Sequence, residues 1–128
     1  MDFGRYVGIE YRDPDDAETN GLHCWELVEL VMREEFKVDP PKVSFSDNYK
    51  KAMPVFMSEL EHWQRIRTGD EQPGDMVLFS IGGIHCHCGI IIDTAHMLHC
   101  LKGRNTTIER YRSPEWAKRL VGFYRWQN

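Results

Sequence analysis

The chain has 128 residues, of which 41% are hydrophobic and 28% are charged, and its formal net charge is −4 at pH 7. These values are those of an ordinary globular protein with material for one core, and they predict a single domain over residues 1–128. The acidic balance and the scattered basic residues disfavour nucleic-acid binding, and no apolar run is long enough for membrane insertion.

The first residues, MDFGRYVGIEYRDPDD, lack the basic start and the apolar segment of a secretory signal. We therefore expect a protein without a signal peptide, made in the cytoplasm, that stays there or leaves by a route other than its own signal. In a reducing compartment its cysteines are expected to be free thiols or ligands rather than disulfides. They are Cys24, Cys86, Cys88 and Cys100.

The first half of the chain predicts two helices. After a short extended segment and a loop rich in Pro, Asp and Asn-Gly, residues 21–36 (GLHCWELVELVMREEF) place apolar residues at helical spacing, with Asn20 as the N-cap. Cys24 then lies in the first turn of this helix. Two prolines follow, and a second helix over roughly residues 49–62, interrupted at Pro54, carries a buried stripe of Phe56, Leu60 and Trp63.

From Met76 onward the pattern changes to short β-rich segments, namely MVLFSI, HCGIIID, MLHCL, TTIERY and RLVGFYRW. The turn-forming stretches GG, DTAH, KGRN and SPEWAK separate them. Helices followed by a meander of strands predict an α+β fold. We expect the N-terminal helices to pack on one side of an antiparallel β-sheet of about five strands.

Cys24 occupies a position that favours a thiolate. In the first turn of a helix, unpaired backbone N–H groups and the helix dipole stabilise negative charge, so the pKa of the thiol can fall below its ordinary value of about 8.5. The alternative is a small buried hydrophobic residue at a helix end. As a nucleophile, Cys24 needs a histidine that takes its proton and a third polar residue that orients this base.

Four histidines are candidates for the base: His85, His87, His96 and His99. Side chains alternate along a strand, so His85 and His87 point to one face while Cys86 and Cys88 point to the other, and these four cannot converge on one metal. His87 and His99 share a face if the hairpin loop has an odd number of residues, whereas a two-residue loop separates them. The strand register therefore decides whether they cooperate.

Six segments, VGIEYR, GLHCWELV, QPGDMVLF, HCGIIID, MLHC and GFYRW, resemble the NlpC family of papain-like cysteine peptidases in order and approximate spacing. The chain resembles most the branch found in bacteriophage tails and related particles. The resemblance implies an NlpC-type papain-like fold without metal or cofactor, with Cys24 as nucleophile, His87 as base and His99 as its orienting residue. Tyr11 matches a tyrosine of the acyl-intermediate site, and the turn at residues 73–75 matches a structural turn.

The sequence departs from the family pattern beside the nucleophile. His23 and Trp25 stand where the family commonly has Asp and Ser. Both are assigned to the immediate surroundings of Cys24. His23 either perturbs the pKa of Cys24, supplies a competing base, or faces solvent, and a tryptophan at position 25 is compatible with the phage branch.

Several other polar residues are assigned no chemistry. Three cysteines are expected to pack as small buried thiols: Cys86, Cys88 and Cys100. His85 is expected to face solvent, and Glu109 to form cross-strand charge pairs with nearby arginines. Four acidic residues lie between Tyr11 and Cys24: Asp13, Asp15, Asp16 and Glu18. They form either a solvated loop or a site for an amine such as that of a diamino acid.

The resemblance implies a peptidase that hydrolyses peptidoglycan stem peptides through a thioester on Cys24. Expected partners are the stem peptide and the hub proteins of a tail or baseplate, within a phage tail or tail-like particle. Two alternatives stay open. One is a zinc-dependent hydrolase in which Cys24, His87 and His99 bind the metal; the other is a non-catalytic tail component that keeps the fold.

Overall fold

The computed structural model describes residues 3–11, 24–42, 49–101 and 104–127, with the backbone alone described at residues 49–52, 85 and 86. A short 3-10 turn, η1 (Gly4–Tyr6), precedes three helices, α1 (Cys24–Phe36), α2 (Tyr49–Leu60) and α3 (Pro114–Ala117). The strands are β1 (Gln64–Ile66), β2 (Met76–Ile81), β3 (Ile84–Ile91), β4 (His96–His99), β5 (Thr107–Arg110) and β6 (Leu120–Arg125). None of the described helices has the length and apolar character needed to cross a membrane.

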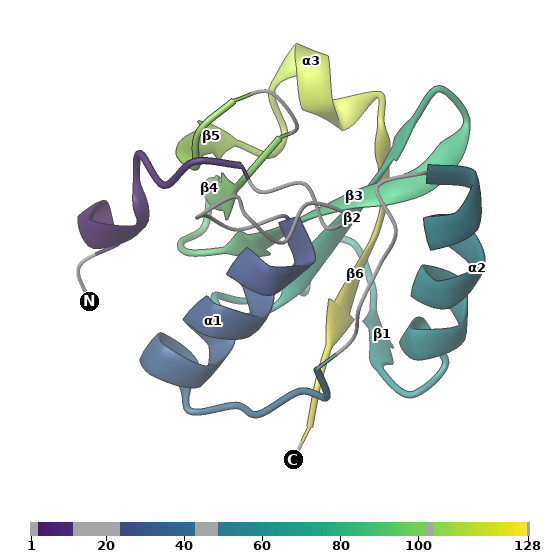
Figure 1. Ribbon diagram of the computed structural model, residues 1–128, viewed down its shortest axis with the longest axis horizontal. Coiled ribbons are helices and arrows are strands. Elements are labelled where there is room, and N and C mark those ends of the chain that lie inside the picture. Colours follow the sequence, from purple (N-terminus) through teal and green to yellow (C-terminus); the bar gives the residue numbers. More distant parts are fainter. Residues whose placement is uncertain (1–2, 12–23, 43–48, 102–103, 128) are drawn as a thin grey trace.

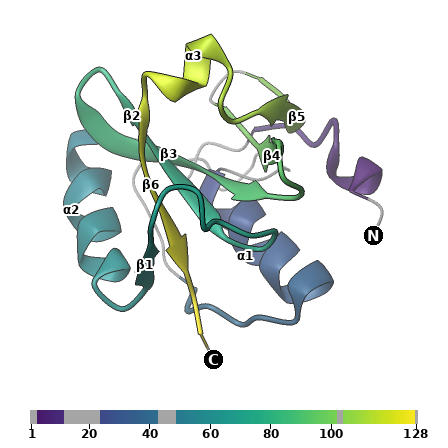
Figure 2. The same ribbon diagram turned by 180° about the vertical axis from the view of Figure 1, so that it is seen from behind.

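The strands form one six-stranded sheet in the order β1-β6-β2-β3-β4-β5, and all the paired strands are antiparallel. Strands β2 to β5 form the expected meander. Strand β6 then returns across the sheet and lies between β1 and β2, as Figure 2 shows from behind. The α+β prediction is confirmed, with one strand more than expected.

Three short elements were not predicted from the sequence: η1, β1 and α3. Strand β1 has three residues, too few for an alternating pattern, and it exists because Gln64 to Ile66 pair with β6. Helix α3 lies in the stretch expected to be a turn. Ser113 caps it by accepting a hydrogen bond from the backbone N–H of Trp116, and Pro114 occupies the first turn.

Helix α1 begins at Cys24 in the described chain, and the proposed cap at Asn20 lies outside the described residues. Its end precedes the two prolines. Lys37 adopts a left-handed φ of 56°, and the N–H of Val38 donates to the carbonyl of Met32 at 3.1 Å. Helix α2 continues through Pro54, where an interruption was expected, because Phe56 and Leu60 are held in the core.

Helices α1 and α2 cover the same face of the sheet (Figure 1) and enclose what we call the helix-side core. Trp25 is fully buried there, in edge contacts with Phe56 and Trp63 at centroid distances of 5.7 and 5.5 Å. Its indole N–H donates to Glu29 at 2.5 Å. Trp25 therefore joins the start of α1, next to Cys24, to α2.

The opposite face of the sheet carries a second cluster, here called the far-side core. Its buried members are Ile66, Val77, Phe79, Ile91, Met97, Tyr111, Trp116 and Phe123. Trp116 comes from α3, which closes over this face near β3 and β4 (Figure 1). Strands β2, β3, β4 and β6 contribute residues to both clusters, as the pleat of a sheet buried on both faces requires.

Candidate active site

His87 and His99 lie on the same face of the sheet. Strands β3 and β4 pair Gly89 with His99 and Ile91 with Met97, so odd-numbered residues face together. Nε2 of His87 and Nδ1 of His99 are 2.9 Å apart, and the two side chains are 4% and 1% exposed. The register on which their cooperation depends thus brings the two rings into a buried hydrogen bond.

Gly89 makes room for this contact. It lies directly opposite His99, and a Cβ built at Gly89 would be 3.1 Å from Cβ of His99 and 3.2 Å from the carbonyl oxygen of Leu98. Because His99 leans over Gly89 to reach His87, the position two residues after His87 has to be small. The contact between the two histidines thus explains why a glycine follows His87 by two residues in the segment HCG.

A Gly89→Ala variant is therefore expected to push His99 away from His87. The Leu98 carbonyl is backbone and cannot move aside, so we expect destabilisation of roughly 1–3 kcal/mol, the usual cost of overpacking. Thermal unfolding measures it, and the histidine ring NMR signals should shift together. Gly82→Ala tests only the strain of a positive φ, since no atom lies within 4 Å of its Cβ position. An undisturbed histidine pair in Gly89→Ala would contradict the argument.

Aromatic rings surround the pair. His87 stacks against Trp116 and Phe79, with centroid distances of 5.5 and 6.0 Å and interplanar angles of 28° in both cases. His99 meets the edge of Trp116 at 5.1 Å and 88°. These contacts fix the ring planes and keep the hydrogen bond between the rings in an apolar setting, where it is stronger than in water.

Glu109 completes the arrangement and was not predicted to take part. Its Oε2 lies 2.5 Å from Nε2 of His99, so His99 bridges His87 and a carboxylate. Strand β5 pairs Thr107 with His99, which makes Glu109 the diagonal neighbour on the same face. In the sequence, Glu109 is an odd-numbered acidic residue on the predicted strand that follows the strand of His99. This pattern predicts a contact with His99 only once the register of the two strands is known.

His99 is neutral at neutral pH. Its pKa is lowered to about 4, mainly by burial and also by a charge on His87, while the hydrogen bond to Glu109 acts in the opposite direction. The contact between His99 and Glu109 is therefore a hydrogen bond from a neutral ring to a carboxylate. Because His99 takes up no proton in the folded state at neutral pH, it can orient His87 without competing for the proton of a thiol.

Cys24 stands at the start of α1 and packs, half-buried, against the helix-side core. Helix α1 lies on β3 and β4, whose pairing begins at Gly89 and His99, so the histidines lie where the two strands separate. A thiolate at Cys24 raises the pKa of His99 and of Cys100. Cys24 is thus within electrostatic range of the end of β4.

The other candidates have different surroundings. Cys88 and Cys100 are buried in the helix-side core, as predicted, and burial raises the pKa of Cys100 to about 11. Tyr11 is half-buried against the same core. The residue His23, the acidic residues between 13 and 18, and the side chains of His85 and Cys86 lie outside the described parts of the chain.

Metal binding by this set receives no geometric support. Among the described residues, which include Cys24, His87 and His99, no three His, Cys, Asp or Glu side chains are grouped as ligands. The facing nitrogens of the two histidines point at each other at 2.9 Å. A shared zinc would instead require each nitrogen to point at the ion at about 2.0–2.1 Å.

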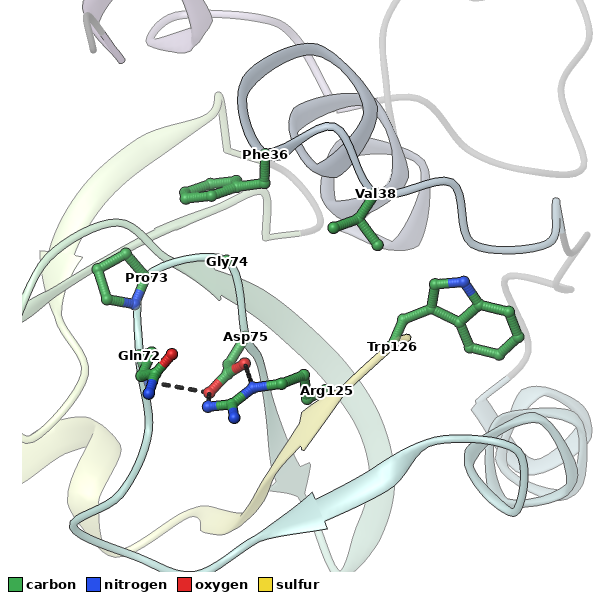
Figure 3. Close-up of a pocket in the computed structure, with 8 residues that line it drawn as sticks. All are labelled: Phe36, Val38, Gln72, Pro73, Gly74, Asp75, Arg125 and Trp126. Atoms are coloured by element: carbon green, nitrogen blue, oxygen red, sulfur yellow. Dashed lines mark hydrogen bonds and ion pairs between the residues drawn. The ribbon is translucent and has the colours of Figure 1, made fainter. Parts of the chain in front are cut away.

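A pocket of about 200 Å³ lies at the other end of α1 (Figure 3). It is lined by Phe36 and Val38, by residues 72–75, and by Arg125 and Trp126. Along a 13-residue helix, Phe36 is about 18 Å from Cys24. The pocket is therefore separate from the histidine pair.

The turn at residues 73–75 forms one wall of this pocket and has the structural role that was predicted for it. The Asp75 carboxylate is buried and accepts two hydrogen bonds from Arg125, at 2.7 and 2.8 Å, and one from the N–H of Gln72 at 2.8 Å (Figure 3). Gly74 has a φ of 96° and packs against Phe36. These contacts join the start of β2 to the end of β6.

Comparison with known proteins agrees with this architecture. A murein DD-endopeptidase/LD-carboxypeptidase of Escherichia coli K12, MepS, is 23% identical over 117 residues, which cover 91% of this chain and 55% of that protein. An NlpC/P60 protein from Bacillus cereus superposes with a TM-score of 0.67 at 15% identity, over 98% of this chain and 38% of the other. The peptidoglycan hydrolase RipB of Mycobacterium tuberculosis gives a TM-score of 0.64 at 18% identity, over 95% and 59%.

The chain thus spans about half the length of the curated relatives it matches. The structural similarities, all at low identity, support the fold. The family assignment comes from the sequence profile, which extends over nearly all of the described elements. Residues 9–125 match the profile of the NlpC/P60 family, and the chain belongs to this family.

Proposed function

We propose that the protein is a cysteine peptidase that hydrolyses peptidoglycan stem peptides through Cys24, His87 and His99. The observation that carries the proposal is the buried 2.9 Å contact between Nε2 of His87 and Nδ1 of His99. This contact engages Nε2 of His87, the nitrogen to which an orienting residue would bind. Nδ1 of His87 is then the nitrogen that would take the proton of a thiol. A cysteine at the start of the helix that packs on these strands is the matching nucleophile.

The proposed reaction gives each of these residues a role. Nδ1 of His87 takes the proton of the Cys24 thiol, and the thiolate attacks the scissile carbonyl. The backbone N–H of Cys24 and the hydroxyl of Tyr11 stabilise the oxyanion. His87 then returns its proton to the leaving amine, which departs as the thioester forms. Finally His87 deprotonates a water molecule, which hydrolyses the thioester and releases the carboxylate product.

The substrate class is supported by two similar proteins of the same family. One carries the name of a murein endopeptidase and carboxypeptidase, and the other that of a peptidoglycan hydrolase. From the resemblance to the NlpC family, rather than from these two names, we propose that the protein cuts the bond between the side-chain carboxyl of D-glutamate and a diamino acid. Mass spectrometry of the released muropeptides identifies the new amine and so checks this choice.

The decisive test uses purified peptidoglycan and a Cys24→Ala variant. We expect the variant to lose activity by about 10⁴-fold or more, because the nucleophile of a triad is removed. Cys100→Ala is the matched control and should stay close to wild type, since the Cys100 thiol is buried and its pKa is raised. Alkylation should abolish wild-type activity and label Cys24, while a chelator should have no effect.

Two outcomes would support the alternatives instead. Activity that a chelator removes and alkylation spares would indicate zinc chemistry. A Cys24→Ala variant as active as the wild type, or a wild-type protein that cuts no stem peptide, would favour a non-catalytic component with this fold.

We also propose that the protein is carried in a phage tail or tail-like particle, with hub or baseplate proteins as partners. The support is the resemblance of the chain as a whole to the phage branch of the family, with which the tryptophan at position 25 is compatible. Mass spectrometry of purified particles from the producing strain tests this: peptides of this chain should co-purify with tail proteins. Their absence from intact particles would end the proposal.

A further inference from the structure

We propose that Glu109 is a positioning residue that sets the tautomers of both histidines, so that His87 presents an unprotonated Nδ1 to Cys24. The inference rests on the proposed function, because it assigns a role within the same site. Its physical core, the placement of protons on two rings, is nevertheless measurable without any substrate.

The argument starts at the carboxylate. An ionised carboxylate only accepts hydrogen bonds, and Oε2 of Glu109 is 2.5 Å from Nε2 of His99. Nε2 of His99 must therefore carry a proton. A neutral imidazole has one N–H, so Nδ1 of His99 is left as an acceptor.

The second ring follows from the first. Nδ1 of His99 accepts at 2.9 Å from Nε2 of His87, which must then be the protonated nitrogen of that ring. In neutral His87 the lone pair is consequently on Nδ1. This is the form that can take a proton from a thiol, and after protonation the bond to His99 remains intact.

The reverse arrangement shows why a carboxylate is needed. If His99 carried its proton on Nδ1, it would donate to Nε2 of His87, and the proton of neutral His87 would move to Nδ1. The contact between the two rings would be equally well satisfied, but His87 could no longer act as a base. Among the contacts described for the two rings, the one that distinguishes the two arrangements is that of Glu109 at the far nitrogen of His99.

The surroundings keep His99 in a single-proton form. Its ring is 1% exposed and meets the edge of Trp116, and burial lowers its pKa. Glu109 itself is about one-third exposed, at the open edge of the sheet on β5. A substitution at Glu109 can therefore alter the carboxylate without opening a cavity in the far-side core.

The test compares the wild type with Glu109→Gln by long-range ¹H–¹⁵N NMR of the histidine rings. In the wild type, Nε2 should be the protonated nitrogen of both His87 and His99. The glutamine has the same size but can donate as well as accept, so it permits both arrangements. A mixture or reversal of tautomers is expected, and a group with a purely structural role would not produce it.

Two kinetic readouts accompany the spectra. The rate of Cys24 alkylation at neutral pH should fall in Glu109→Gln, and kcat/KM on peptidoglycan should fall by about 10-fold or more, as for other carboxylates that orient a functional histidine. The matched control is Glu115→Gln on α3, the same change at an exposed carboxylate 3.9 Å from Arg119. It should leave the tautomers, the alkylation rate and kcat/KM unchanged.

The outcomes separate the two proposals. A wild type with the proton of His99 on Nδ1, or a Glu109→Gln variant with wild-type tautomers and alkylation rate, overturns the role of Glu109 whatever the substrate. Shifted tautomers and slower alkylation in a protein that cuts no stem peptide uphold Glu109 and reject the peptidase function. Circular dichroism and thermal unfolding confirm that the compared variants are folded.

Discussion

A His87→Asn variant is expected to lose about 10⁴-fold or more in kcat/KM on peptidoglycan while keeping its fold. Nε2 of this imidazole is held by His99, and we propose that Nδ1 takes the proton of the Cys24 thiol. Asparagine has no basic nitrogen, so the proton of Cys24 would have to leave to water. The loss should match that of the Cys24→Ala variant, because residues of a triad act as a unit and their effects do not add.

Three measurements test this expectation. In His87→Asn the rate of Cys24 alkylation should shift to higher pH, toward an ordinary thiol pKa near about 8.5. The double variant with Cys24→Ala should be no worse than either single variant. His62→Asn is the matched control, since its side chain is exposed and away from the pair. A His87→Asn enzyme within about tenfold of wild type would remove His87 from the mechanism.

The second large effect concerns stability. An Arg125→Met variant is expected to lose about 3–5 kcal/mol in the free energy of unfolding, because it leaves the Asp75 carboxylate buried with one N–H donor in place of three. For a chain of this size the melting temperature should fall by on the order of 10 °C or more. Calorimetry at neutral pH measures both quantities.

Arg67→Met provides the matched control. The Arg67 side chain is 85% exposed and its nearest acidic partner, Asp70, is 3.5 Å away, so the change should cost less than about 1 kcal/mol. Adding Asp75→Asn to Arg125→Met should recover part of the loss, since the amide keeps the bond to Gln72 without a buried charge. A loss in Arg125→Met as small as that in Arg67→Met would show that solvent reaches Asp75 in the folded protein.

Much of the fold was predictable because its signals are local. Residues 76–81 were expected as a strand from six β-rich residues before a Gly-Gly turn, and β2 has those bounds. The start of α1 near Cys24 and the buried stripe of Phe56, Leu60 and Trp63 depend on short-range spacing too. Strand β1 escaped prediction because three residues with one buried side chain carry no period.

The candidate site could be predicted only in part, because its contacts depend on strand register and not on local signals. Histidines at 87 and 99 could be paired as candidates, but whether they meet depends on the β3–β4 register, and so does the small space at Gly89. The contact of Glu109 with His99 depends on a further register, that of β4 with β5. Pairing across strands is set by the whole sheet, which no short window of sequence contains.

The position of β6 bears on how the chain reaches this structure during synthesis. Strand β6 comes last among the described elements, yet it is an interior strand that joins β1 to β2. Until it emerges from the ribosome, β2 exposes an unpaired edge and β1 has no partner. Its residues pair with positions 41 to 61 places earlier in the chain, from Phe79↔Leu120 to Gln64↔Arg125, so closure is entropically costly and slow. A nascent chain stopped before Leu120 should therefore remain protease-sensitive, and the β6 segment supplied as a separate peptide should be able to complete the sheet.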